Sequence, residues 1–394
     1  MDLKRFVDFD RLEIAFQAKT DKELKKRHFI FSTMKYPWMV KAGTTLTKLS
    51  LNLHLPVQGL IKSTLFDVFC GGETIEGCER SSNELAAFNI GAIFDYSVEG
   101  ETSEEAFDHT AEEILRTVER AATMEYIKVA AFKVTGLGSF DLLAKLHAGE
   151  KLTSDEEEAW KRIQERVNKI CSLAHQLNVS VLIDAEETWI QKPIDELTID
   201  MMKRYNRDKV LIYYTFQMYC HSMLDNLKDH HKQAEANGYK LGAKLVRGAY
   251  MEKERARAEA MNYQDPIQPN KESTDRDFDA AMEYCVEHIH EIGLFSGSHN
   301  EESNYKLTLI MDKHGLKPND KRIGFGQLYG MSDHISFNLA HEGYNVIKYV
   351  PYGPLKSTMP YLIRRAEENT SVKGQSGREL SLLTAEIKRR KQPN

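Results

Sequence analysis

VSVLIDA at residues 179–185, VLIYYTFQMY at 210–219 and KLGAKLVRGAY at 240–250 are three short apolar runs, rich in β-branched and aromatic residues. Stretches with helical periodicity separate each run from the next. Such an alternation is typical of parallel strands that are joined by crossover helices. The central part of the chain therefore predicts an α/β fold built on a parallel sheet.

The same alternation extends outward in both directions, from about Leu65 to residue 327. The further candidate strands are LFDVF (65–69), FNIGAIFDYS (88–97), YIKVAAFKVTG (126–136), GLFSGSH (293–299) and KRIGFGQ (321–327). Eight strands, each followed by a helix, favour a (β/α)8 TIM barrel over an open doubly wound sheet. A further extended piece, NVIKYVPYG (345–353), is expected to lead into a helix near the end of the chain.

The first part of the chain lacks this alternation. Residues 1–64 are expected to form an N-terminal helical addition, with helical segments near 35–42 and 44–53. The barrel and its C-terminal helices are expected over residues 65–394. Within it, Ser154 with Glu157 fits a capping box at the start of a long helix.

Composition limits the possible functions. The 394 residues are 41% hydrophobic and 28% charged, and the mean hydropathy is -0.49, which is ordinary for a soluble globular protein. The net charge of -6 gives no general attraction to nucleic acid. The five cysteines form neither a CxxC pair nor a zinc spacing, which favours a reducing compartment. With no apolar signal segment, the chain is expected to be cytoplasmic.

Polar residues gather where the predicted strands end. In a barrel of this kind the chemistry lies at the carboxyl ends of the strands. A single buried polar residue there is usually structural, but a ring of them indicates a site. The residues of this ring are Lys133, Asp184, Glu186, Gln217, Arg247, Tyr250, His299, Asn300, Gln327 and Tyr329.

Two kinds of chemistry for this ring need no organic cofactor. Lys133 could form a Schiff base, because an amine in an apolar strand can have its pKa lowered. Alternatively, Asp184, Glu186 and His299 could bind a divalent metal ion, as in a metal-dependent barrel hydrolase or isomerase.

A third possibility is an organic cofactor that lies across the strand ends, with hydrogen bonds from Gln217, Arg247 and Asn300. The best candidate for a dinucleotide fingerprint, Gly324 to Gly330, has the spacing GxGxxxG and not GxGxxG. A nucleotide here would therefore not be bound by a Rossmann unit. The residues alone leave these three chemistries open, beside a barrel that only binds a ligand.

The segment YLIRRAEEN (361–369) places polar side chains on one side of a predicted helix. Tyr361, Arg364, Arg365 and Glu368 stand at i, i+3, i+4 and i+7. Two adjacent guanidinium groups can bind a carboxylate through several N–H donors, and Glu368 can meet a cationic group. The pattern predicts an amino-acid site, and its alternative is a solvated face with ion pairs.

With these residues in view, the chain resembles proline dehydrogenase, the family that also forms one module of bifunctional proline utilisation proteins. The resemblance covers roughly residues 65–390, in family order. Its motifs are Ile183-Asp-Ala-Glu-Glu187, Lys244-Leu-Val-Arg-Gly-Ala-Tyr250, Ser298-His-Asn300, Tyr349-Val-Pro-Tyr-Gly353 and Tyr361-Leu-Ile-Arg-Arg365 with Glu368-Asn369.

The resemblance implies a distorted barrel that binds FAD and oxidises L-proline to Δ1-pyrroline-5-carboxylate. It also implies that electrons pass to a membrane quinone, with peripheral contact at the inner face of the membrane, and that a separate pyrroline-5-carboxylate dehydrogenase acts downstream. A hydroxyproline dehydrogenase is the alternative within the same class. The segment Glu379–Lys391, with Leu380, Leu383 and Ile387 in one stripe, is expected to pack on the barrel and not on a membrane.

The resemblance also implies roles for individual residues. Arg364 and Arg365 would bind the substrate carboxylate, with Glu368 near the ring nitrogen. The remaining substrate and catalytic positions are Lys133, Asp184, Leu245, Tyr250, Tyr349 and Tyr361, with Asp184 expected to form a hydrogen bond with Tyr250. The expected flavin contacts are Asp184, Gln217, Lys244, Val246, Arg247, Gly248, Thr274, His299, Asn300 and Gln327.

Three positions carry further expectations. Many bacterial members have arginine where this chain has Lys244; lysine can donate a hydrogen bond there but lacks the arginine fork, which bears on the flavin's redox tuning. Glu73 could pair with Arg364 and close the site. Tyr349 would fill the slot around the pyrrolidine ring, so we expect a preference for proline over hydroxyproline.

Overall fold

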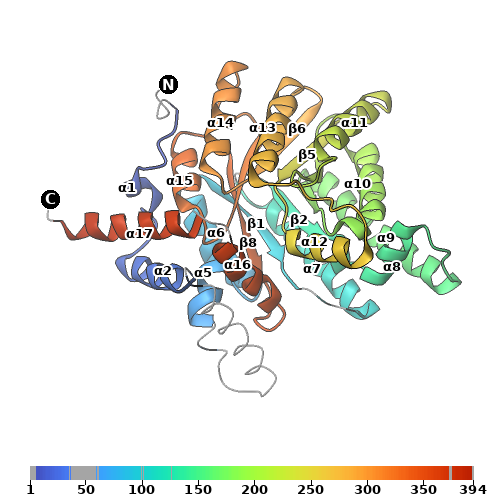
Figure 1. Ribbon diagram of the computed structural model, residues 1–394, viewed down its shortest axis with the longest axis horizontal. Helices are drawn as coiled ribbons and strands as arrows, with labels where there is room; N and C mark the ends of the chain where they lie inside the picture. Colours follow the sequence, from blue (N-terminus) through green and yellow to red (C-terminus); the bar gives the residue numbers. More distant parts are fainter. Residues whose placement is uncertain are drawn as a thin grey trace. The chain divides into compact units, whose positions relative to one another are not determined.

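The computed structural model describes residues 6–34, 36, 59, 62–98, 100, 102–125, 127–371 and 375–392, and only the backbone of 367–371, 375 and 376. In this part of the chain eight strands form one sheet, in the hydrogen-bonded order β1-β8-β7-β6-β5-β4-β3-β2 (Figure 1). Helices alternate with the strands, so the fold is the predicted (β/α)8 barrel. The strands are β1 (Ile90–Tyr96), β2 (Val129–Lys133), β3 (Ser180–Asp184), β4 (Ile212–Gln217), β5 (Leu241–Val246), β6 (Ile292–Gly297), β7 (Ile323–Leu328) and β8 (Val346–Tyr352).

The chain divides into two compact units. The first comprises Met1–Glu99, Gln327–Glu342 and Lys348–Asn394, and the second comprises Gly100–Gly326 and Gly343–Ile347. The predicted boundary at residue 64 stays a prediction. Within the described residues no helix combines the length and the apolar character needed to cross a bilayer.

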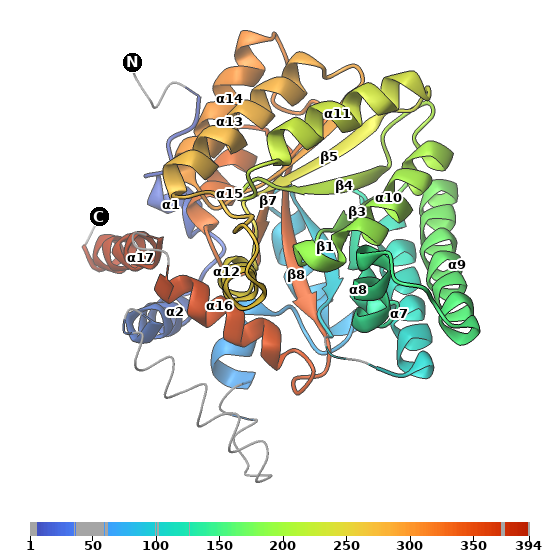
Figure 2. The same ribbon diagram turned by 45° about the vertical axis from the view of Figure 1, so that its right-hand side comes forward.

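The second unit contains β2 to β6 in parallel register. Gly242 allows β4 and β5 to approach, because a Cβ there would lie 2.2 Å from the carbonyl oxygen of Ile212. Figure 2 shows α9 alongside α7, with α10 beside α9. The helices of this unit are α7 (Glu104–Ala122), α8 (Phe140–Ala148), α9 (Ser154–Leu177), α10 (Gln191–Tyr205), α11 (Met223–Ala236), α12 (Met251–Met261), α13 (Lys271–Glu287) and α14 (Glu301–Lys313).

Local signals explain where α9 begins and ends. Its capping box uses Thr153 and Glu156, one residue before the predicted pair Ser154 and Glu157. The side chain of Thr153 accepts from the backbone N–H of Glu156, and the Glu156 carboxylate accepts from the N–H of Thr153. Asn178, with φ 56°, ends the helix in the left-handed region.

The first unit contains β1 and β8 together with helices from both ends of the chain. Its apolar core joins α1, α2, α5, α16 and α17 through side chains such as Phe16, Phe31, Phe69, Leu362 and Leu383. The elements are α1 (Leu12–Ala15), α2 (Asp21–Met34), a π-helix η1 (Lys62–Phe66), α5 (Asp67–Phe69), η2 (Glu76–Cys78), α6 (Glu79–Ala86), α15 (Asp333–His341), α16 (Met359–Ser371) and α17 (Gln375–Lys391).

Helix α17 lies beside α2, as Figures 1 and 2 both show. Leu383 is buried in the shared core, and Leu380 and Ile387 are partly buried against it. This C-terminal segment thus packs on the helices α2, α1 and α16, and the choice between packing on the barrel and contact with a membrane stays a prediction.

One predicted strand is wrong. LFDVF (65–69) is helical, because η1 and α5 occupy residues 62–69. Phe66 and Phe69 stand three residues apart and both enter the core, a spacing that suits a helix, and a short apolar run does not distinguish the two structures. The eighth strand is instead β8, which was expected only as an extended piece. The helical segments predicted near 35–42 and 44–53 lie outside the described residues.

Candidate active site

Two lysines share one carboxylate at the carboxyl ends of β2, β3 and β5. Lys133 and Asp184 are opposite each other in the β2–β3 register. Lys244 Nζ donates to Asp184 Oδ1 at 2.5 Å, and Lys133 Nζ lies 3.7 Å from Asp184 Oδ2. The Lys244 side chain is 6% exposed and that of Asp184 15%, so solvent screens this cluster weakly. Asp184 therefore brings two lysine ammonium groups together at these strand ends.

Glu186 connects the ends of β2, β3 and β4. Its carboxylate accepts from the backbone N–H of Thr135 at 3.0 Å and from the Thr135 hydroxyl. Its backbone carbonyl accepts from Gln217 Nε2 at 2.7 Å, which fixes the orientation of that amide. Burial raises the pKa of Glu186 to about 7. Thr135 belongs to the 3-10 turn η3 (Val134–Gly136).

Arg247, just after β5, is held by three side chains. Its Nε donates to Asp275 Oδ1 at 2.7 Å, and its two terminal nitrogens donate to Ser298 Oγ at 2.8 Å and Ser303 Oγ at 2.9 Å. The guanidinium lies 4.4 Å from the centroid of the Phe278 ring. Arg247 is therefore fixed in place beside the end of β6.

Helix α14 begins at the same strand end. Asn300 is its N-cap and accepts from the backbone N–H of Ser303 at 3.0 Å, and the backbone N–H of Asn300 donates to Ser298 Oγ. The N-terminus of a 13-residue helix next to a fixed arginine provides donors of the kind that phosphate groups bind. Together with Lys244 and the Gln217 amide, this donor set fits the phosphates and the polar ring edge of FAD.

The other predicted substrate and flavin contacts of the second unit lie on β5, on α13 and in the segments that follow β5 and β6. Leu245 is fully buried in β5, and Val246 ends that strand. Gly248 has φ 132°, and a Cβ there would lie 2.5 Å from the ring of Tyr219, so this position requires glycine. Thr274, on α13, is buried and donates to the carbonyl of Asn270 at 3.4 Å. His299, between β6 and α14, is partly buried.

Tyr250 is the N-cap residue of α12. The Lys253 ammonium lies 5.6 Å from the centroid of its ring. Asp184 accepts a hydrogen bond from Lys244 at 2.5 Å, and the expected hydrogen bond between Asp184 and Tyr250 stays a prediction.

Sequence reasoning missed the residues that fix α12 to the loop after β3. Glu254, fully buried, accepts from the N–H of Thr188 at 2.7 Å and from its hydroxyl at 2.6 Å. Lys253 Nζ donates to Glu187 Oε1 at 2.7 Å. The only signal was the charge pattern of Met251–Arg255, which resembles a solvated helix face.

The predicted arginine helix is α16, in the first unit. Arg365 is buried and Arg364 is partly buried. The Arg365 guanidinium lies 5.3 Å from the centroid of the Tyr361 ring, which is itself buried. The alternative of a solvated face is therefore wrong for these side chains, whereas the side chain of Glu368 lies outside the described residues.

Three further predicted residues belong to the first unit. Tyr349 lies in β8 and is 8% exposed. Gln327, in β7, is buried and accepts from the hydroxyl of Ser336 at 2.9 Å. Glu73 accepts from Lys62 and from the backbone N–H of Leu355, and its pairing with Arg364 stays a prediction.

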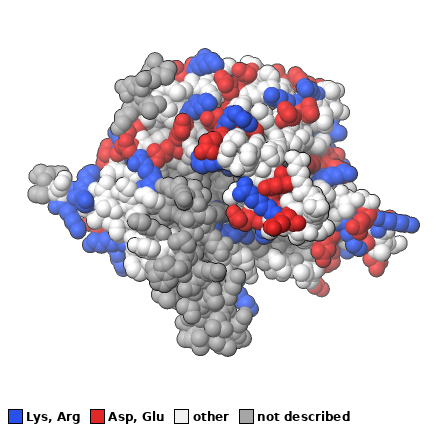
Figure 3. Space-filling model, viewed as in Figure 1, with Lys and Arg blue, Asp and Glu red and all other residues white. Residues whose placement is uncertain are grey.

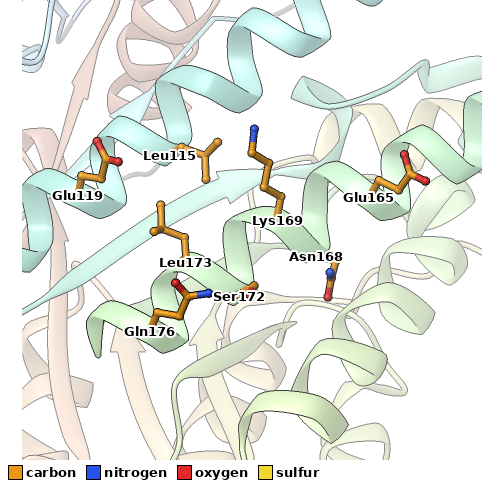
Figure 4. A pocket seen from close by; sticks show the side chains of 8 residues that line it. All are labelled: Leu115, Glu119, Glu165, Asn168, Lys169, Ser172, Leu173 and Gln176. Atoms are coloured by element: carbon orange, nitrogen blue, oxygen red, sulfur yellow. Dashed lines mark hydrogen bonds between the residues drawn. The ribbon is translucent and has the colours of Figure 1, made fainter.

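Nothing in the described part of the chain supports the metal hypothesis, since no group of three or more His, Cys, Asp or Glu side chains there could hold a metal ion. A groove of about 660 Å³ lies between α7 and α9 (Figure 4), and its lining residues are not among those predicted to form the site. It is lined by Leu115, Glu119, Glu165, Asn168, Lys169, Ser172, Leu173 and Gln176.

Comparisons with known proteins agree with the resemblance. The chain is 37% identical to a carbapenem antibiotics biosynthesis protein, CarD, of Pectobacterium carotovorum subsp. carotovorum, over 84% of this chain and 86% of that protein. It is 34% identical to mitochondrial proline dehydrogenase 1 of Dictyostelium discoideum, over 86% and 67%. With the Homo sapiens proline dehydrogenase 1 the identity is 40%, over 61% of this chain and 40% of the human protein.

The fold is also found among solved structures. Proline utilization A from Bdellovibrio bacteriovorus superposes with a TM-score of 0.75 at 20% identity, over 97% of this chain and 44% of that one. The family model described as proline dehydrogenase matches residues 78–378, which include the strand-end residues and the arginine pair of α16. The chain therefore belongs to the proline dehydrogenase family.

Proposed function

We propose that this proline dehydrogenase uses FAD to oxidise L-proline to Δ1-pyrroline-5-carboxylate, and that its electrons pass to a quinone. The observation that carries the proposal is the strand-end donor set, in which Lys244, Arg247 and Gln217 have fixed orientations. The product would then serve a separate pyrroline-5-carboxylate dehydrogenase. The family match supports the reaction, and the chemistry of the donor set supports the cofactor.

The substrate carboxylate is assigned to Arg364 and Arg365. Arg365 is buried and stacked on the Tyr361 ring, so little side-chain entropy is lost when its guanidinium binds an anion. A charge-assisted pair formed in such a site is stronger than one in water. Tyr349, Tyr361 and Leu245 are assigned to the apolar surroundings of the ring.

The amine of proline must be neutral before a hydride can leave the carbon next to it. Lys133 and Lys244 both contact the carboxylate of Asp184. We assign to these two ammonium groups the task of disfavouring a further cation, because a nearby like charge favours the neutral form of an amine. Lys133 is assigned to the substrate.

When bound, FAD supplies the acceptor for the hydride, at its N5 atom. The residues that would hold it are those at the strand ends. Arg247 and the N-terminus of α14 are assigned to its phosphates. Lys244 and Gln217 are assigned to the ring, and the remaining contacts are Asp184, Val246, Gly248, Thr274, His299, Asn300 and Gln327.

The test is an absorption spectrum of the purified chain before and after L-proline is added without oxygen. We expect a flavin band at about 450 nm that is bleached by L-proline, with pyrroline-5-carboxylate as the product. A colourless protein with a stoichiometric divalent metal would contradict the proposal. Equal catalytic efficiency on trans-4-hydroxy-L-proline would favour the hydroxyproline alternative.

A further inference from the structure

Three consecutive residues of the segment after β3 contact helix α12. They are the first two residues of the 3-10 turn η4 (Thr188–Ile190) and the residue before it. The contacts are an ion pair at 2.7 Å, a pair of hydrogen bonds and a cation–π contact at 4.6 Å; they join Glu187 to Lys253, Thr188 to Glu254 and Trp189 to Arg257. Contacts at three successive positions fix both the rotation of the helix and its place along this segment.

Glu254 makes the buried contact of the three. It is fully buried, and both oxygens of its carboxylate accept from Thr188, one from the backbone N–H at 2.7 Å and one from the hydroxyl at 2.6 Å. These two donors offset the cost of burying the carboxylate. The outer face of the helix is different, since Glu252, Lys253 and Glu259 are exposed. Figure 3 shows acidic and basic side chains side by side where Figure 1 places α12.

The two partners of this contact are each four residues from a candidate site residue. Tyr250 precedes Glu254 by one helical turn, and its carbonyl accepts from the Glu254 N–H at 2.9 Å. Asp184 ends β3 four residues before Thr188. The contact between Thr188 and Glu254 therefore limits how far Tyr250 and Asp184 can move apart.

The segment that leads from β5 into α12 is located separately, by the end of β4. The Tyr219 N–H donates to the carbonyl of Arg247 at 2.8 Å. A Cβ at Gly248 would lie 2.5 Å from the Tyr219 ring, so the backbone there lies directly against that ring. The chain up to Gly248 is thus located by β4, and Glu254 locates the turn that follows, which begins at Tyr250.

We propose that Glu254 is a positioning residue, which through Thr188 holds the Tyr250 hydroxyl next to Asp184. The inference rests on the proposed function, because it takes up the role expected for Tyr250 in the oxidation of proline. Glu254 acts only through Tyr250, since its own carboxylate is buried and both of its oxygens are engaged by Thr188.

A double-mutant cycle with Tyr250 tests this role, with kcat/KM for L-proline measured against a soluble dye as acceptor. Glu254→Ala should lower kcat/KM by about tenfold to a hundredfold, because a small misplacement of a site residue has an effect of this size. In Tyr250→Phe, which already lacks the hydroxyl, Glu254→Ala should lower it by no more than about twofold further. An equal fall in both backgrounds would overturn the proposal.

Two milder variants keep the test decisive if Glu254→Ala folds poorly. Thr188→Val removes the hydroxyl donor and keeps the shape of the side chain, and we expect kcat/KM to fall by about threefold. Glu254→Gln keeps the length of the side chain and can still accept from the Thr188 N–H, so it should retain more activity than Glu254→Ala. Full activity in Thr188→Val would overturn the assigned path through Thr188.

Asn206 provides a matched control for a loss of stability. It is fully buried, and its side chain donates to the carbonyls of Ile212 and Lys240 and accepts from the N–H groups of Leu211 and Ile212. These groups lie at the amino ends of β4 and β5, opposite the strand ends that carry the candidate site. Asn206→Ala should lower the midpoint of urea unfolding and leave kcat/KM close to that of the unaltered chain. Falls in kcat/KM of equal size in Asn206→Ala and Glu254→Ala would leave Glu254 with a structural role only.

Hydrogen exchange, followed by mass spectrometry, measures the contact without any reaction. Backbone amides of residues 185–190 and 250–256 should exchange faster in Glu254→Ala than in the unaltered chain, and those of Asn206→Ala should not. Unchanged exchange at 185–190 in Glu254→Ala would overturn the proposal. If the unaltered chain does not oxidise L-proline, the proposed function fails and this inference fails with it. If it does, and Glu254→Ala costs the same in both Tyr250 backgrounds, this inference alone fails.

Discussion

Lys348 and Asp333 form an ion pair inside the first unit, with Nζ 2.9 Å from Oδ1 and side chains that are 1% and 5% exposed. Asp333 Oδ2 also accepts from Arg27 of α2 at 2.8 Å. Lys348 donates further to the carbonyls of Leu328 and Met331. One carboxylate thus joins α2, β8 and the start of α15, and every charge in the group has a partner, as buried charges require.

Asp333→Ala should destabilise the chain by about 3–5 kcal/mol, because it leaves two buried cations without their anion. The midpoint of urea unfolding, followed by circular dichroism, measures the loss. Asp67→Ala is the matched control: Asp67 pairs with Lys26 at the same distance of 2.9 Å but is 51% exposed, and we expect a loss of at most about 1 kcal/mol. Equal losses in the two variants would contradict the assigned importance of burial.

The pH dependence of stability should carry a contribution from Glu186. Burial raises its pKa to about 7, above a value of about 4.3 in the unfolded chain. Between these values the unfolded state binds fewer protons, so stability falls as the pH rises and levels off above pH 7. Glu186→Gln, which cannot ionise, should reduce this fall by up to about 3 kcal/mol.

Urea unfolding at several pH values between 5 and about 8 tests that expectation. A smaller slope should remain in Glu186→Gln, because burial also raises the pKa of Asp195 to about 6. The exposed Glu158→Gln is the control and should keep the slope of the unaltered chain. An unchanged slope in Glu186→Gln would show that this carboxyl titrates normally.

Some of the site was predictable because it follows from strand order. Lys133 and Asp184 each end a predicted strand, and adjacent parallel strands place their ends together, as the β2–β3 register shows. Lys244 reaches the same carboxylate although it does not end its strand. For residues at or near the carboxyl ends of parallel strands, the order of the strands therefore predicts which side chains lie close together.

Other features depend on contacts that no local pattern contains. Lys348 stands in the apolar run 345–353, and its charge is compatible with that run because Asp333, fifteen residues away, enters the same core. Arg27 is 306 residues from Asp333 in sequence. The strand predicted for LFDVF (65–69) is wrong for a related reason. Its apolar residues pack on helices from both ends of the chain, so the composition of the segment alone does not determine whether it is a strand or a helix.

Removing the charge of Lys244 should make the flavin harder to reduce, if the ring lies next to this residue as proposed. Lys244→Met removes the cation nearest Asp184 and should lower the midpoint potential by on the order of 30 mV, equivalent to about 1.4 kcal/mol for two electrons. Lys244→Arg keeps the charge and should change the potential much less. Titration against reference dyes measures both, and equal potentials in all three proteins would remove Lys244 from the flavin site.

Arg365→Met should raise the KM for proline at least about tenfold, on the order of 1.4 kcal/mol, because it removes a charge-assisted contact to the substrate carboxylate. Steady-state kinetics with a soluble acceptor measure the change, and kcat should fall less than kcat/KM if the contact serves mainly binding. Arg80→Met is the control, since the Arg80 side chain is 84% exposed and pairs with Glu84 one turn along α6. A KM in Arg365→Met equal to that of the control would show that α16 does not bind the carboxylate through this residue. The flavin spectrum of the variant should match that of the unaltered chain, because the predicted loss concerns the substrate and not the cofactor.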